Sequence, residues 1–263
     1  MTNDHAAAPA PAWPPFNPAL WAAAWREARL GLAYFAALHA ALDGALDPGP
    51  PPGTEVMEDE LKFVAQRRRD LDSDLARQGR ITAQDSSAAN LLAPWGLNLS
   101  DRKALSDLMP KLALLVSDWA ISGSRMPLMY FKNKYSLARP YERDPSIQPF
   151  VGNPGHPSYP SGHTCQHYYA ALILDHIVSP IERELAAGNQ PALDQVEKRR
   201  TVMFDIANDA AENREYAGVH YPADTAAGRR LAAAMFEIMK AVLAEPLEAA
   251  AGEWRKWRQF RPV

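Results

Sequence analysis

Helical spacing of apolar residues, interrupted by proline and glycine, is the feature that most restricts how this chain can fold. Between Leu20 and Leu46, apolar side chains recur at the spacing of one helix face. The segment DPGPPPG at 47–53 should end that helix, because proline and glycine do not continue one. Alternating, β-branched strand patterns are nearly absent, and the sequence shows no internal repeat. The pattern therefore predicts an all-α bundle.

The same spacing predicts further helices and one domain. They are expected at about 57–77, 102–122, 127–137, 163–178, 193–213, 224–244 and 247–260. Pro110 should kink or begin one of these helices. The run Arg67–Arg69 is interpreted as a solvated helix face. Residues 1–17, rich in alanine and proline, are predicted to form an extended arm, and 18–263 a single helical domain.

Composition restricts partners and location. The chain has 263 residues, 47% of them hydrophobic, and a formal net charge of −3. This composition is that of a globular protein without an overall positive field, so nucleic acid is not an expected partner. No apolar run in the sequence approaches the roughly 18 residues that a transmembrane helix needs. We expect a soluble protein, cytoplasmic as the sequence stands and periplasmic if an export signal has been removed. The oligomeric state is left open.

The first segment with candidate chemistry is Lys132 to Arg139, followed by Pro140. Seven residues make two helical turns, so the two cations are expected to project from one side of a helix. Pro140 disfavours helical geometry at Arg139, which should therefore lie where the helix ends and a loop begins. An ammonium beside a planar guanidinium suits a phosphate. Taken alone, the segment is more typical of two surface cations near a helix C-terminus.

The second segment is HPSYPSGHT at 156–164, which runs into an apolar helix. Ser161 is a natural N-cap, and Gly162 lets the backbone approach a ligand closely. The free amides at such a helix start form an anion site. His163 in the first turn could give a proton to an anion held there. A capped helix with an incidental histidine is the alternative interpretation.

The third segment runs from Arg214 through His220 to Asp224. Pro222 suits a helix start, which places His220 on the entering loop and Asp224 in the first turn. A carboxylate there could accept a hydrogen bond from one imidazole nitrogen and leave the other as a free lone pair. This is the base-and-orienter arrangement of a catalytic triad, applied to a histidine nucleophile. Complementing the helix dipole would explain Asp224 but not His220.

In this order, the three segments resemble the signature of the type 2 phosphatidic acid phosphatase and vanadium haloperoxidase superfamily. The matching elements are Lys-x6-Arg-Pro, Pro-Ser-Gly-His and Arg-x5-His-x3-Asp, over about residues 132–230. Residues 158–164, SYPSGHT, are especially similar to the bacterial class A acid phosphatases. The resemblance implies a helical bundle with the site between helices, hydrolysis of small phosphate monoesters through a phosphohistidine, and no metal or other cofactor.

The resemblance also implies roles for individual residues. His220 would attack phosphorus, His163 would protonate the leaving alcohol, and Asp224 would hold His220. The phosphate oxygens would be bound by Lys132, Arg139, Ser161, Gly162 and Arg214.

Two positions qualify this interpretation. Asn213 stands where the family usually has serine, so we expect altered support around the pocket rather than a different reaction. His156, seven residues before His163, keeps open a vanadium-dependent haloperoxidase that holds vanadate, because vanadium bromoperoxidases are similar there. A non-catalytic phosphate-binding protein is a further alternative.

His163 and His167 have metal-ligand spacing, but Thr164 stands where the zincin pattern needs glutamate, so His167 is expected to be a hydrogen-bonded histidine.

Overall fold

A computed structural model describes residues 23–86, 90–98 and 101–260, and every regular element within these ranges is helical. The predicted all-α class is confirmed. The predicted arm at 1–17 lies outside the described residues. The helices are α1 (Ala23–Ala40), α2 (Thr54–Leu71), α3 (Leu75–Ser86), the 3-10 turn η2 (Ala93–Trp95), α4 (Arg102–Leu108), α5 (Pro110–Ala113), the π-helical segment η3 (Leu114–Ser122), α6 (Arg125–Tyr135), α7 (Pro140–Arg143), α8 (Gly162–Leu185), α9 (Gln190–Tyr216), α10 (Pro222–Val242) and α11 (Ala244–Gln259).

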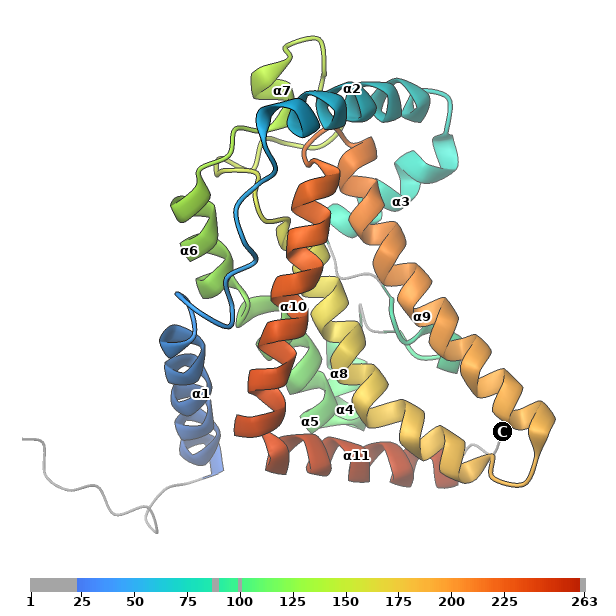
Figure 1. The fold of residues 1–263 in the computed structure, drawn as a ribbon. Coiled ribbons are helices and arrows are strands. Elements are labelled where there is room, and N and C mark those ends of the chain that lie inside the picture. The colour runs from blue at the N-terminus through green and yellow to red at the C-terminus, as the bar shows by residue number, and fades with distance from the viewer. Residues whose placement is uncertain (1–22, 87–89, 99–100, 261–263) are drawn as a thin grey trace, which may run out of the picture.

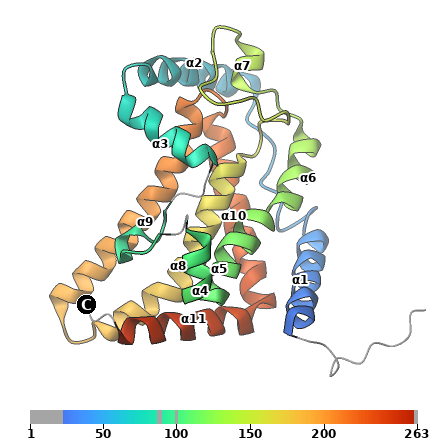
Figure 2. The ribbon, with the colours of Figure 1, turned by 180° about the vertical axis from the view of Figure 1, so that it is seen from behind.

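Helix α8 forms the centre of the bundle. It packs against α10, α9, η3 and α11, and Figures 1 and 2 show it between α9 and α10, with α11 crossing the ends of α8 and α10. Helix α2 crosses the opposite end of α9, close to the point where α10 begins. The core between these helices is aliphatic and aromatic, and it includes Tyr34, Leu38, Val116, Tyr169, Leu174, Leu231, Met235 and Trp254. This apolar interior holds the three helices together, so that the start of α8, the end of α9 and the start of α10 lie at the same end of the bundle.

The helix predicted over 57–77 is wrong in its extent, because two helices stand there. Helix α2 ends at Leu71, and α3 begins at Leu75. Asp74 causes the break, since its carboxylate accepts a hydrogen bond from the backbone N–H of Arg77 at 2.8 Å. Short polar side chains compete with the helix backbone in this way and favour helix starts. Pro110 begins α5, as predicted.

The prediction of a solvated face at Arg67–Arg69 is wrong for its first two members. Arg67 forms an ion pair with Glu215 at 2.7 Å and lies over the ring of Tyr216. The guanidinium of Arg68 donates to the carbonyl of Gln148 at 2.6 Å. Sequence alone could not place these contacts, because they join α2 to the end of α9 and to the loop after α7.

Candidate active site

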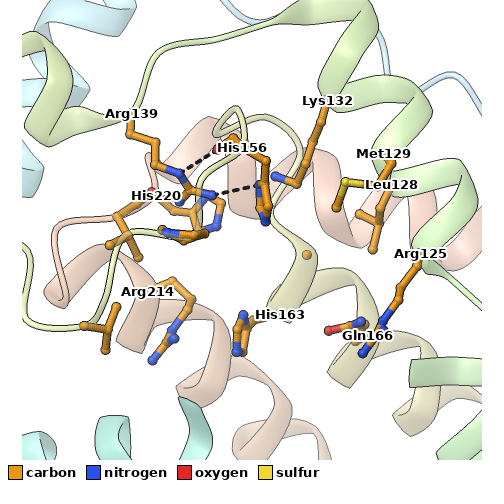
Figure 3. A pocket seen from close by; sticks show the side chains of 14 residues that line it. Arg125, Leu128, Met129, Lys132, Arg139, His156, His163, Gln166, Arg214 and His220 are labelled. Carbon is orange, nitrogen blue, oxygen red and sulfur yellow. Dashed lines mark hydrogen bonds between the residues drawn. The ribbon is translucent and has the colours of Figure 1, made fainter. Parts of the chain in front are cut away.

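A pocket of about 340 Å³ opens between α6, the start of α8 and the loops that precede α8 and α10. Figure 3 shows its side chains converging from these separate elements. Its lining carries basic and histidine side chains together with a small apolar wall: Arg125, Leu128, Met129, Lys132, Arg139, Val151, Pro154, His156, Gly162, His163, Gln166, Arg214, Val219 and His220.

Lys132, in the last turn of α6, is buried and holds the loop before α8. Its Nζ donates to the carbonyls of Pro157 at 2.9 Å, Ser158 at 2.7 Å and Pro160 at 2.7 Å. Burial and the Arg139 charge lower the pKa of Lys132 to about 7. Three acceptors nevertheless match the three N–H groups of the charged ammonium, whereas a neutral amine has only two. The geometry therefore favours the protonated form.

Arg139 reaches the pocket from a loop. Helix α6 ends at Tyr135, and Ser136 has a left-handed φ of 44°, so the predicted common helix face with Lys132 is wrong. Arg139 itself is extended, with ψ 158°, as the following Pro140 predicted. Its Nε donates to the carbonyl of His156 at 2.9 Å and its Nη1 to that of Val219 at 2.7 Å. One buried guanidinium thus joins the two loops that lead into α8 and α10.

His220 and Asp224 form a buried pair at the start of α10. His220 Nδ1 lies 2.8 Å from Asp224 Oδ2, which also accepts from the backbone N–H of Tyr221 at 3.0 Å and from the hydroxyl of Ser158. Burial raises the pKa of Asp224 to about 6, so the carboxylate is ionised above that pH. An ionised carboxylate can only accept, which puts the proton on Nδ1 and leaves Nε2 with a free lone pair.

The charge state of His220 follows from the same burial. Loss of hydration, followed by the positive charges of Arg139 and Lys132, holds the pKa of His220 well below the usual histidine range. His220 is therefore a neutral imidazole with an oriented ring, which is the state that a nitrogen nucleophile requires.

His163, the second residue of α8, also lines the pocket. Burial, then the charge of Arg214, holds its pKa well below the usual range. Its neighbour His167 is buried, and the ring Nδ1 lies 2.8 Å from the carbonyl of His163. His167 is thus a hydrogen-bonded histidine, as predicted.

The starts of α8 and α10 are joined directly. Ser161 caps α8, and its backbone N–H donates to the carbonyl of Asp224 at 3.0 Å. Gly228, one turn further along α10, permits this approach, because a Cβ there would lie 2.7 Å from the carbonyl oxygen of Ser161. Close contact between the two helix starts places His163 and His220 in one pocket.

The remaining predicted residues divide between the pocket lining and its support. Gly162 and Arg214 line the pocket, whereas Ser161 is fully buried behind the lining and accepts from the hydroxyl of Thr164 at 2.9 Å. Asn213 is also absent from the lining. Its amide donates to Gln84 at 2.7 Å and fastens α9 to α3.

His156 does line the pocket, where its Nδ1 lies 3.2 Å from Arg139 Nη2. The same Nδ1 lies 3.1 Å from the carbonyl of Pro157, so it accepts from Arg139 in one tautomer and donates to Pro157 in the other. Burial, together with the nearby Lys132 and Arg139 charges, lowers the pKa of His156.

Sequence reasoning missed several residues of the site. Ser158 lies within the second motif, yet its bond to Asp224 could not be read from spacing. Arg125 stands seven residues before Lys132, and that helical spacing was a usable signal. Glu215, which accepts from Arg67 at 2.7 Å and from Thr225 at 2.7 Å, had none. Glu215 follows Arg214 on α9, and its carboxylate joins this end of α9 to Thr225, the residue after Asp224 on α10.

Two comparisons bear on the class of this protein. Residues 132–246 match the family model described as the VCPO second helical-bundle domain. The crystal structure of the first transmembrane PAP2 type phosphatidylglycerolphosphate phosphatase from Bacillus subtilis is similar, with a TM-score of 0.51 and 16% sequence identity. The similarity covers 84% of this chain and 97% of that one. No curated protein matches the chain.

The fold is a PAP2-type helical bundle. The family match covers residues 132–246, which include all three motifs. Within the described ranges, none of the helices combines the length and the apolar character required to cross a bilayer.

Proposed function

We propose that this protein is a phosphatase that hydrolyses phosphate monoesters through a phosphohistidine, as a class A acid phosphatase does. The observation that carries the proposal is the His220–Asp224 pair, 2.8 Å apart, in a pocket that Lys132, Arg139 and Arg214 also line. Such an arrangement presents an oriented, neutral nitrogen beside positive charge. Spreading cations around a phosphoryl group stabilises the charge that its three equatorial oxygens carry in the transition state.

The proposed reaction has two steps. His220 Nε2 attacks phosphorus, the bond between phosphorus and the ester oxygen breaks, and His163 gives its proton to the departing alkoxide. Water then attacks the phosphorus of the phosphohistidine, His163 takes up a proton of that water, the bond between phosphorus and His220 Nε2 breaks, and inorganic phosphate leaves. Asp224 keeps Nδ1 protonated throughout and balances the positive charge that develops on the ring.

His163 must carry a proton before the first step, although burial and Arg214 lower its pKa in the free pocket. A bound phosphate dianion reverses that effect, because a neighbouring negative charge favours the imidazolium form. Substrate binding and protonation of the general acid are therefore coupled in this proposal.

Turnover of p-nitrophenyl phosphate by protein treated with EDTA tests the proposal. We expect hydrolysis to continue, because side chains supply the cations, and rapid quenching to trap phosphohistidine. Activity that EDTA abolishes and a divalent metal restores would contradict the mechanism. Phosphate binding without turnover would instead favour a non-catalytic phosphate-binding protein.

A vanadium-dependent haloperoxidase is the second candidate, favoured by the family match and by His156 in the pocket lining. The chemistry of the pocket fits vanadate, since Arg139 and Arg214 could donate to its oxygens, the charge of Lys132 would attract it, and His220 Nε2 could ligate the metal. Bound vanadate would supply peroxide activation. An assay of bromide and peroxide with added vanadate distinguishes this candidate. Loss of bromination in His156→Ala, with phosphatase activity retained, would support a role for His156 in it.

A further inference from the structure

The pocket extends away from the histidines along α6. Arg125 and Lys132, both in its lining, stand seven residues apart on this helix. Seven residues correspond to two turns and a rise of about 10 Å. On α8, Gln166 lies one turn beyond His163, and Figure 3 draws Arg125 and Gln166 across the pocket from Arg139 and Arg214. The pocket therefore has a second polar end, formed by Arg125 and Gln166.

Apolar side chains separate the two ends. Leu128 and Met129, one turn after Arg125, line the pocket between Arg125 and Lys132. A molecule that fills the pocket would accordingly meet cations and histidines first, then a short apolar wall, and then a further cation. This order matches a substrate whose phosphoryl group and second polar group are joined by a short carbon framework.

The charge at the second end is not balanced by the pocket. None of the described residues in the lining is a carboxylate, whereas four of them are arginine or lysine. Arg125 is exposed, and within the described part of the chain it has no hydrogen bond or ion pair. Lys134 on the same helix differs, since it forms an ion pair with Asp47 at 2.7 Å. Lys132, Arg139 and Arg214 line the end of the pocket that holds the histidines, so Arg125 supplies additional positive charge at the other end.

We propose that Arg125 binds a second anionic group of the substrate, a carboxylate or a further phosphate, at the end of the pocket that lies a rise of about 10 Å along α6 from Lys132. The preferred substrates are then phosphomonoesters that carry another negative charge at the far end of a short carbon chain. This inference rests on the proposed phosphatase function and names the substrate class for the same pocket.

Matched straight-chain alkyl phosphates of about four to eight carbons test the proposal, since such chains cover the estimated helix rise. Their far ends carry a methyl, a carboxylate or an ammonium group. We expect wild type to favour the carboxylate over the methyl ester by about fivefold or more in kcat/KM, the ratio expected for a charge-assisted contact at a partly exposed site. In Arg125→Glu the order should reverse, with the ammonium ester preferred.

Lys103→Glu is the matched control, because it makes the same charge change at a side chain that is 84% exposed and absent from the pocket lining. It should keep the wild-type preference. An equal loss of preference in Lys103→Glu would overturn the proposal in favour of long-range attraction, which salt would also weaken. Equal rates for all three end groups, unchanged in Arg125→Glu, would overturn it as well.

Binding measurements test the anion site independently of the proposed phosphatase activity. Alkyl phosphonates with the same end groups cannot be hydrolysed, and their affinity is measurable by calorimetry. If no ester turns over but the carboxyl phosphonate still binds more tightly, and Arg125→Glu reverses that order, the phosphatase proposal fails and the anion site stands. If the end group changes neither binding nor rate, the anion site is overturned.

Discussion

The two ends of the pocket are built differently. At the buried end, Lys132 and Arg139 donate to backbone carbonyls of the loops before α8 and α10, and Asp224 holds His220 at 2.8 Å. At the other end, Arg125 is exposed, and the part of the chain that the structure describes offers it no partner. One end is fixed by buried hydrogen bonds, whereas the other is a long side chain in water.

This difference in construction suits the two ends of the pocket to different tasks, catalysis at the buried end and substrate selection at the exposed end. Groups that stabilise a transition state are effective when they are already oriented before the reaction, because no reorganisation is then needed. A flexible exposed arginine gives less stabilisation but can adapt to molecules of several lengths. The buried end should therefore govern the rate for every substrate, and the exposed end should govern the choice among substrates.

The largest expected effect is at His220. His220→Ala should lower kcat by at least about a thousandfold for every phosphomonoester, because each needs the nucleophile. Stopped-time assays and phosphohistidine trapping measure this loss. If the variant still formed a phosphoenzyme, the nucleophile would be another residue, and the comparison of the two pocket ends could no longer assign the reaction to His220.

His163 should show a loss that depends on the leaving group. His163→Ala should lose about a hundredfold or more with alkyl phosphates, whose alkoxides are basic, and much less with p-nitrophenyl phosphate. A plot of log kcat against leaving-group pKa checks this for both proteins. The same loss across the series would assign His163 a role in binding rather than proton transfer.

Lys132 and Lys134 offer a direct comparison within α6. Lys132→Met leaves three loop carbonyls without their donor, two of them in buried hydrogen bonds, and should destabilise the fold by about 2 to 3 kcal/mol. Lys134→Met removes a partly exposed ion pair and should change the free energy of unfolding by less than about 1 kcal/mol. Denaturant unfolding measures both. Equal changes would mean that Lys132 does not fasten the loop before α8.

The smallest effect is on the pH dependence of stability. Burial raises the pKa of Asp224 to about 6, above its usual value, so the folded state holds a proton that the unfolded chain releases. The stability that this proton contributes is present at low pH and is lost as pH rises through about 6. Asp224→Asn should remove this loss, which thermal unfolding between about pH 4 and 7 detects. If the dependence of stability on pH is the same in Asp224→Asn and in wild type, the pKa of the Asp224 carboxyl lies at its ordinary value.

Local patterns in the sequence predicted much of the helical framework and the positions of several motif residues. Ser161 caps α8, Pro222 begins α10 with Asp224 in its first turn, and Pro140 keeps Arg139 extended, as expected. These outcomes depend on interactions between residues a few positions apart, which helix periodicity and capping chemistry describe.

Only the tertiary structure decided which of these residues share a pocket and what each one contacts. Lys132 pairs with the loop before α8, Asn213 turns away to Gln84, and Arg67 pairs with Glu215 far along the chain. Each contact depends on the angle and the distance at which two helices cross. Those are set by packing of the whole core, as where Gly228 lets α10 approach α8, and no local sequence pattern encodes them.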